Sequence, residues 1–123
     1  MKTASDPRHK KREALIKKLY ELSFNQNKTI PSSLKLIVEN LATIDKIIAD
    51  CAPEWPIEKL NKIDLAVLRL AVFELMLEKK NPPKVIIDEA SELGKEYGSQ
   101  NSAKFINGVL GSVLKKLDGK NKR

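Results

Sequence analysis

Residues 84–110 read KVIIDEASELGKEYGSQNSAKFINGVL, and this stretch carries the clearest structural signal in the chain. Two helical patterns meet within it at Gly98, a residue suited to a left-handed helix end. We expect one helix over about residues 83–97 and another from residue 101 or 102 to 117. The chain therefore ends in two helices joined by a short polar turn.

Three further helical patterns precede this pair. Asp6 and Pro7 are a favourable cap and first residue for a helix that ends near residue 25. Apolar residues at alternating spacings of three and four predict one helix over residues 30–52. Residues 63–78 are apolar on most faces, which is typical of a central helix packed on several sides. The chain is predicted to be all-α.

Length and composition favour one globular domain over residues 1–123. Hydrophobic residues make up 41% and charged residues 32%, and no apolar run approaches the ~20 residues that a membrane-spanning helix needs. The N-terminus lacks the apolar segment of a secretory signal. Cys51 is the single cysteine, so no internal disulfide is possible, and a reducing cytoplasm is the expected compartment.

The net charge of +7 is concentrated at the two ends of the chain. Residues 1–18 contain seven Lys and Arg against two acidic residues, and residues 115–123 contain five against one, whereas the body between them is slightly acidic. We expect residues 1–12 and 118–123 to be flexible. Such asymmetry indicates either a polyanionic partner or tails that keep a small protein soluble.

Catalytic chemistry is not indicated by the sequence. Neither a phosphate-binding Gly-rich loop nor a metal-binding Cys/His spacing is present, so we expect no enzyme, cofactor or metal site. His9, the single histidine, lies among lysines, which would lower its pKa in a solvated tail. Four acidic residues of the 83–97 helix are predicted to form a solvated face with i,i+4 ion pairs: Asp88, Glu89, Glu92 and Glu96.

Three blocks in order resemble the NusB family of bacterial transcription antitermination factors. Residues 85–93 (VIIDEASEL) and 105–110 (FINGVL) resemble the family's last two helices. Residues 63–75 (IDLAVLRLAVFEL) resemble its central helix, and residues 18–20 (KLY) form a weaker third match. The resemblance implies a NusB-like bundle in two packed sub-bundles. The segment between Tyr20 and Ile44 is shorter than in typical members, so five or six helices are expected.

The same resemblance implies a function and a set of contacts. Family members bind boxA-like single-stranded RNA together with NusE, a small-subunit ribosomal protein, within an RNA polymerase antitermination complex on ribosomal RNA operons. Asp64 corresponds to an acidic residue that helps to dock NusE. The residues carried over as RNA contacts are Arg8, Lys10, Lys11, Arg12, Tyr20, Asn101, Lys104 and Phe105.

Several of these residues have structural readings as well. Tyr20 and Phe105 could stack on unpaired bases or could pack against the core. Asp64 also suits the first turn of a helix without any partner. Trp55, between two prolines, is expected to be a core plug or a lid rather than a platform for a ligand. The rival functions are a free-standing RNA-binding module in ribosome assembly and a helical protein adaptor that binds no RNA.

Overall fold

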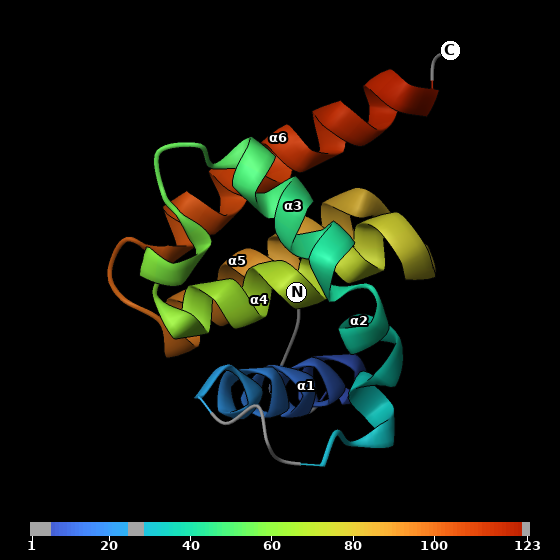
Figure 1. The fold of residues 1–123 in the computed structure, drawn as a ribbon, viewed down its shortest axis with the longest axis vertical. Coiled ribbons are helices and arrows are strands. Elements are labelled where there is room, and N and C mark those ends of the chain that lie inside the picture. The colour runs from blue at the N-terminus through green and yellow to red at the C-terminus, as the bar shows by residue number, and fades with distance from the viewer. Residues whose placement is uncertain (1–5, 25–28, 122–123) are drawn as a thin grey trace.

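The computed structural model describes residues 6–24 and 29–121 (Figure 1). The described residues form six α-helices, three short helical turns and no strand, which confirms the all-α prediction. The α-helices are α1 (Pro7–Phe24), α2 (Lys35–Glu39), α3 (Leu41–Cys51), α4 (Lys62–Phe73), α5 (Pro83–Tyr97) and α6 (Ser102–Asn121). The turns are the 3-10 turns η1 (Ser32–Leu34) and η2 (Ile57–Lys59) and the π-helical turn η3 (Glu74–Glu78).

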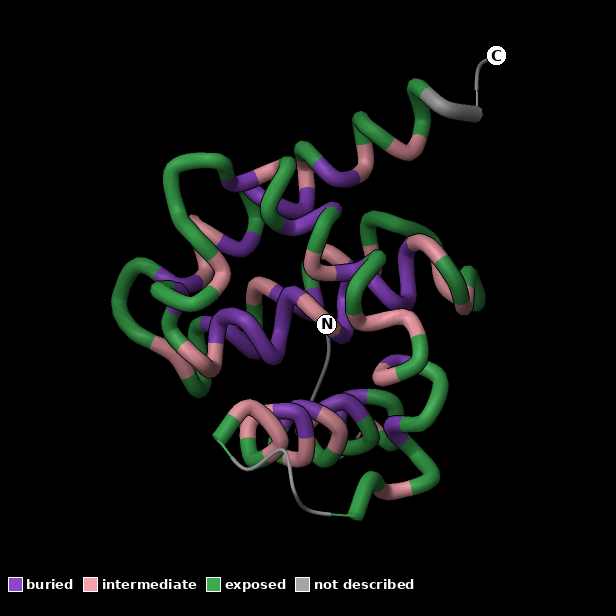
Figure 2. Tube along the Cα trace, viewed as in Figure 1, coloured by how far each residue is buried: buried purple, intermediate pink, exposed green. Residues whose placement is uncertain are grey.

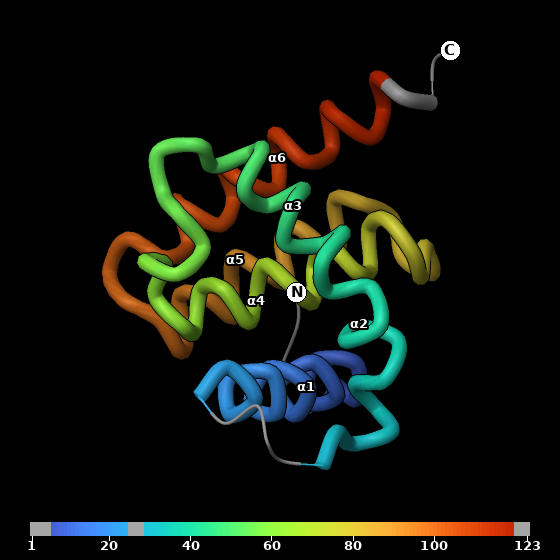
Figure 3. Tube along the Cα trace, in the orientation of Figure 1, coloured from blue at the N-terminus to red at the C-terminus, as the bar shows by residue number. Residues whose placement is uncertain are grey.

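Helix α4 lies at the centre of the bundle and contacts α1, α3, α5 and α6 (Figures 1 and 3). One group of elements, α1, η1 and α2, packs on one side of α4. The other group is α3, α5 and α6, in which α5 and α6 form the most extensive helix pair. The two packed sub-bundles expected from the sequence are therefore present, and they share α4.

The core follows from the apolar spacing of the helices. Nine of the twelve residues of α4 are buried, which agrees with a helix that is apolar on most faces (Figure 2). The helices around it each contribute a single buried stripe, such as Ile44, Ile47 and Ile48 of α3. Among the described residues, no helix is long and apolar enough to cross a membrane.

Helix α1 begins where its cap predicts. The backbone N–H of Arg8 donates to Oδ1 of Asp6 at 2.8 Å, and Pro7 occupies the first helical position, where a missing N–H costs nothing. Residues 7–12, which were expected to be flexible, are helical and bury the side chains of His9 and Arg12. Residues 118–121 continue α6. Residues 1–5 and 122–123 lie outside the described residues.

The helix predicted over residues 30–52 is broken at Asn40. This residue has φ −107° and ψ 12°, and its side-chain amide donates to the carbonyl of Leu36 at 2.8 Å. Asparagine competes in this way with the backbone hydrogen bonds of a helix. The segment consequently forms η1, α2 and α3 in place of one continuous helix.

The helix predicted over residues 63–78 changes register near its end. The N–H of Lys79 donates to the carbonyl of Glu74 at 2.9 Å, the i→i+5 bond of a π-helical turn. Lys79 then ends the segment in the left-handed region at φ 55°. The π-helical turn begins at Glu74, whose carboxylate is buried against α1.

The turn between α5 and α6 depends on two glycines. Gly98 has φ −97° and ψ −155°, so the predicted left-handed cap is wrong. A Cβ on Gly98 would instead collide with the hydroxyl of Ser102, and one on Gly94 would collide with Cδ1 of Ile106. These glycines therefore allow the close packing of α5 on α6.

Candidate nucleic-acid interface

Helix α1 exposes part of its positive charge to solvent. Arg8, Lys10 and Lys11 are exposed, and Lys17 is exposed one and a half turns later. Arg8 makes only a loose ion pair with Asp6, at 3.6 Å, with 68% of its side chain exposed. Three of the four N-terminal cations predicted as RNA contacts are thus free to meet a phosphate.

Arg12, the fourth, is not available to a phosphate. It is 7% exposed, and its Nε and Nη2 donate to the two carboxylate oxygens of Glu74 at 2.9 and 2.7 Å. Its Nη1 also lies 3.6 Å from Oε1 of Glu89. The hydrogen bonds to Glu74 raise the pKa of Arg12, more than burial lowers it. The prediction that Arg12 offers a free cation is therefore wrong, because 100° per residue turns it onto the buried face of α1.

His9 is buried as well, which corrects the prediction of a solvated histidine. Its Nδ1 donates to Oε1 of Glu89 at 2.8 Å. Burial alone would lower the pKa of His9, but the hydrogen bond to Glu89 and the nearby carboxylates of Glu13 and Glu96 raise it overall. The lysines next to it in sequence point away from it along the helix, and so the sign of the expected shift was wrong.

The acidic face predicted for α5 is only partly solvated. Asp88 is exposed and forms the expected i,i+4 pair with Lys84 at 3.6 Å. Glu89, however, is fully buried between α5 and α1. The burial of Glu89 could not be predicted from neighbouring residues, because its partners His9 and Arg12 are about eighty residues away in the sequence.

A surface hollow lies beside the start of α6. It has a volume of about 500 Å³, and its wall includes Trp55, Asn101, Lys104 and Phe105. The rings of Trp55 and Phe105 meet edge to face with centroids 6.4 Å apart. Trp55 is 54% exposed, so it does not plug the core and lies instead on the wall of the hollow. The hollow brings together three of the predicted RNA contacts and adds Trp55, for which a ligand platform was the less favoured prediction.

A second hollow of about 310 Å³ lies where α1 meets the ends of α4 and α5. Tyr20, Lys17, Ile63 and Tyr97 are among the residues that line it. Tyr20 is half-buried and packs edge to face on Phe24, with ring centroids 4.9 Å apart. Tyr20 thus both packs on the core and lines an open surface. Core packing and base stacking, the two roles predicted for it, are therefore compatible.

Asp64 does not face a partner. It is 7% exposed, and among the described residues its Oδ1 has no hydrogen-bond partner. Burial raises the pKa of Asp64, although the Ser102 hydroxyl opposes this shift. The side chain that caps α4 is Asn61, which accepts from the N–H of Ile63 at 2.8 Å. The structure therefore places inside the fold the carboxylate that the resemblance assigns to NusE docking, and that role stays a prediction.

Together, the central α4, the two sub-bundles that share it and the exposed basic start of α1 define an all-α helical-bundle domain with a basic N-terminal helix. The chain belongs to the NusB family, whose family model matches residues 4–115. The resemblance carried by the three sequence blocks is thereby confirmed.

Individual relatives agree with this assignment. The chain is 46% identical over 86 residues to a transcription antitermination protein NusB of Roseiflexus castenholzii, a match that covers 68% of this chain and 61% of that protein. Matches to four such curated relatives cover between 52% and 64% of their lengths.

Solved structures extend the likeness over most of the fold. The structure of T. maritima NusB is similar with a TM-score of 0.80 and 36% identity, covering 94% of this chain and 93% of that chain. A crystal structure of antitermination factors NusB and NusE in complex with dsRNA matches with a TM-score of 0.72. That match covers 90% of this chain and 99% of that chain at 23% identity, so it shows a shared fold.

Proposed function

We propose that this chain is a transcription antitermination factor that binds boxA-like single-stranded RNA together with NusE. In this role it would join an RNA polymerase antitermination complex in the cytoplasm and support transcription of ribosomal RNA operons and maturation of their product. Membership of the NusB family supports the proposal. The observation that carries it for this chain is the exposure of Arg8, Lys10 and Lys11 on the outer face of α1.

The exposed cations of α1 supply the electrostatic part of the binding. Each can neutralise one phosphate and release its counterion, which makes affinity fall with salt. Two of the three are lysines, which attract phosphate as point charges without the planar fork of arginine. Backbone attraction follows from these residues, whereas base selectivity must come from elsewhere on the surface.

The hollow at Trp55 and Phe105 supplies a place for an unpaired base. Single-stranded RNA is recognised largely by stacking of splayed bases on aromatic side chains. Lys104 is exposed on the rim and can meet the adjoining phosphate, and Asn101 offers a neutral amide there. Tyr20 lines the second hollow, together with Ile63 of α4 and Tyr97 at the end of α5.

NusE is proposed as the protein partner, as in the solved complex of a NusB with NusE. Because Asp64 is 7% exposed and its carboxylate interacts with Ser102 of α6, we expect it to influence that partner through the packing of α4 on α6.

A fluorescence titration of labelled boxA RNA against a scrambled RNA, with and without NusE, tests the proposal. The expected result is selective binding of boxA RNA that tightens when NusE is added. Equal binding of both RNAs, unchanged by NusE, would favour a free-standing module in ribosome assembly. NusE binding without any RNA binding would favour a helical adaptor.

A further inference from the structure

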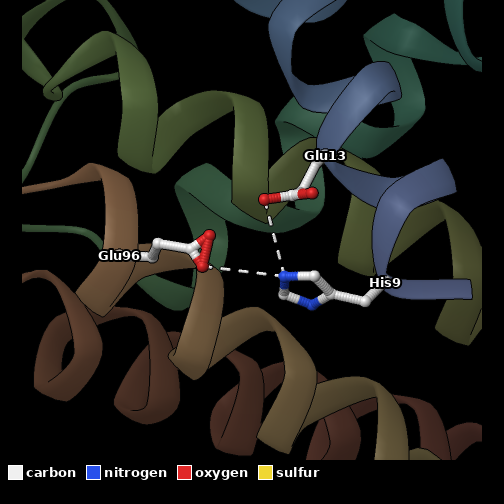
Figure 4. A group of neighbouring side chains, drawn as sticks. All are labelled: His9, Glu13 and Glu96. Carbon is white, nitrogen blue, oxygen red and sulfur yellow. Dashed lines mark ion pairs between the residues drawn. The ribbon is translucent and has the colours of Figure 1, made fainter. Parts of the chain in front are cut away.

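Three side chains from two helices converge beside the buried histidine. His9 and Glu13 are one turn apart on α1, and Glu96 reaches them from the last turns of α5 (Figure 4). One nitrogen or oxygen atom from each lies within 4.8 Å of the others. Nε2 of His9 is 3.5 Å from Oε2 of Glu13 and 3.6 Å from Oε2 of Glu96. The sequence predicted no metal-binding cluster, because these residues meet only through the packing of α1 on α5.

The two nitrogens of His9 have different surroundings. Nδ1 donates to Glu89 at 2.8 Å, and this carboxylate is fully buried. Nε2 points at Glu13 and Glu96 over distances longer than a usual hydrogen bond (Figure 4). Histidines that bind metals commonly donate their other ring N–H to a carboxylate, which fixes the tautomer and directs the free nitrogen at the ion. Because His9 is 92% buried, its Nε2 can reach an ion only on the side of Glu13 and Glu96.

Two of the three separations fit an ion placed between the groups, and the third, between Glu13 and Glu96, is at most 4.8 Å. Ligand atoms at ~2.0–2.1 Å from a tetrahedral zinc ion lie roughly 3.4 Å from one another. The two separations that involve Nε2 are 3.5 and 3.6 Å, close to this value without any movement of the imidazole. Glu96 is 44% exposed and Glu13 is 22% exposed, so their carboxylates can adjust and an ion can enter from solvent.

A further contact orients Glu13. The hydroxyl of Tyr97 donates to Oε2 of Glu13 in a short hydrogen bond. Tyr97 and Glu96 are adjacent on α5, so the same turn of helix holds Glu13 and supplies the third ligand atom. Carboxylates that bind metals are commonly held by supporting hydrogen bonds of this kind.

We propose that His9, Glu13 and Glu96 bind one divalent transition-metal ion, with zinc the best match to one imidazole and two carboxylates. Three protein ligands leave the fourth tetrahedral position to water. The ion joins the first turns of α1 to the end of α5. It thereby holds in place the part of α1 that displays Arg8, Lys10 and Lys11, without contacting RNA itself.

The test is a zinc titration of the untagged, metal-free chain in competition with a chromophoric chelator. We expect one zinc ion per chain, a rise in the thermal midpoint on zinc addition, and a tetrahedral absorption spectrum when Co²⁺ replaces zinc. Glu96→Gln should lower zinc affinity at least tenfold and abolish the midpoint shift. Glu92→Gln, at an exposed position on the same helix, is the matched control and should bind as the unsubstituted chain does.

Two results would overturn the proposal. The first is no zinc uptake by the unsubstituted chain, which would leave a protonated His9 as the cation between the two glutamates. The second is unchanged zinc affinity in Glu96→Gln, which would place the ion elsewhere. Because neither readout uses RNA or NusE, the outcome is independent of the proposed antitermination function.

Discussion

The outer and inner faces of α1 both carry basic residues, but those on the outer face are exposed to solvent and those on the inner face are buried in ion pairs. On the outer face Arg8, Lys10 and Lys11 are exposed to solvent. On the inner face His9 and Arg12 are buried against carboxylates of α5 and η3. Two neighbours in sequence can therefore differ completely in whether their charge is available to a ligand. A count of basic residues therefore overstates the positive charge that this helix exposes to solvent.

The largest expected effect is on the inner face. Arg12→Ala leaves the buried carboxylate of Glu74 without its bidentate partner, and breaking a buried pair in this way costs about 3–5 kcal/mol. We expect the free energy of unfolding, measured by urea denaturation, to fall by that amount. The matched control is Lys11→Ala on the outer face, where a change within about 0.5 kcal/mol is expected. If Arg12→Ala were as stable as this control but lost RNA binding, the assignment of the two faces would be wrong.

The outer face should show the reverse pattern. Lys10→Glu combined with Lys11→Glu replaces two phosphate-attracting charges with repulsive ones at exposed positions. We expect RNA affinity at low salt to fall at least tenfold while the circular dichroism spectrum and the urea midpoint stay unchanged. Retained RNA affinity in this variant would move the RNA-binding surface away from α1.

The hollow extends the comparison to aromatic residues. Trp55→Ala removes an exposed ring, and stacking of one base is worth about 1–3 kcal/mol, so RNA affinity should weaken by roughly five- to 150-fold. Leu36→Ala removes a similarly exposed apolar side chain on α2 and serves as the control. Equal effects of the two substitutions in the RNA titration would show that the hollow holds no base.

The smallest effect concerns Asp64, a buried carboxyl whose pKa is raised by burial. A raised pKa means that the protonated form stabilises the fold below the unfolded value of about 3.9, and that this stabilisation is lost as pH rises through the folded pKa. Asp64→Asn, which stays neutral, should therefore gain stability relative to the unsubstituted chain as pH rises from 4 to 7. Urea denaturation at both pH values measures the gain. A loss of stability in Asp64→Asn at pH 7 would show instead that hydrogen bonds stabilise the ionised Asp64 carboxylate.

Local signals in the sequence were sufficient for the helices and insufficient for the charged contacts. The bounds of α5 follow from Pro83 and from the glycine after Tyr97, and the start of α1 follows from Asp6 and Pro7. The burial of Arg12 could also be predicted from the local sequence, because a rotation of 100° per residue places Arg12 on the apolar side of α1. The identity of its partner does not, since Glu74 is 62 residues away and comes into reach only when α1 packs on α4 and η3.

The hollow and the triad of His9, Glu13 and Glu96 illustrate the same limit. Trp55 meets Phe105 because the segment between α3 and η2 folds over the start of α6, which no pattern within residues 51–60 predicts.

The break at Asn40 in the helix predicted over residues 30–52 has a local cause, because the Asn40 side chain competes for a backbone carbonyl. Residue type alone did not decide that competition, since asparagines are tolerated inside other helices, as Asn107 is in α6.

The central claim, that the outer face of α1 binds RNA by its exposed cations, is tested most directly by the salt dependence of RNA affinity. Of the five cations predicted as RNA contacts, four remain exposed once Arg12 is excluded: Arg8, Lys10 and Lys11 on α1 and Lys104 on α6. On single-stranded RNA they predict that log affinity falls with log salt at a slope of roughly −3, and of about −1.4 in Lys10→Ala with Lys11→Ala. A slope near zero, or the same slope in both proteins, would contradict the account.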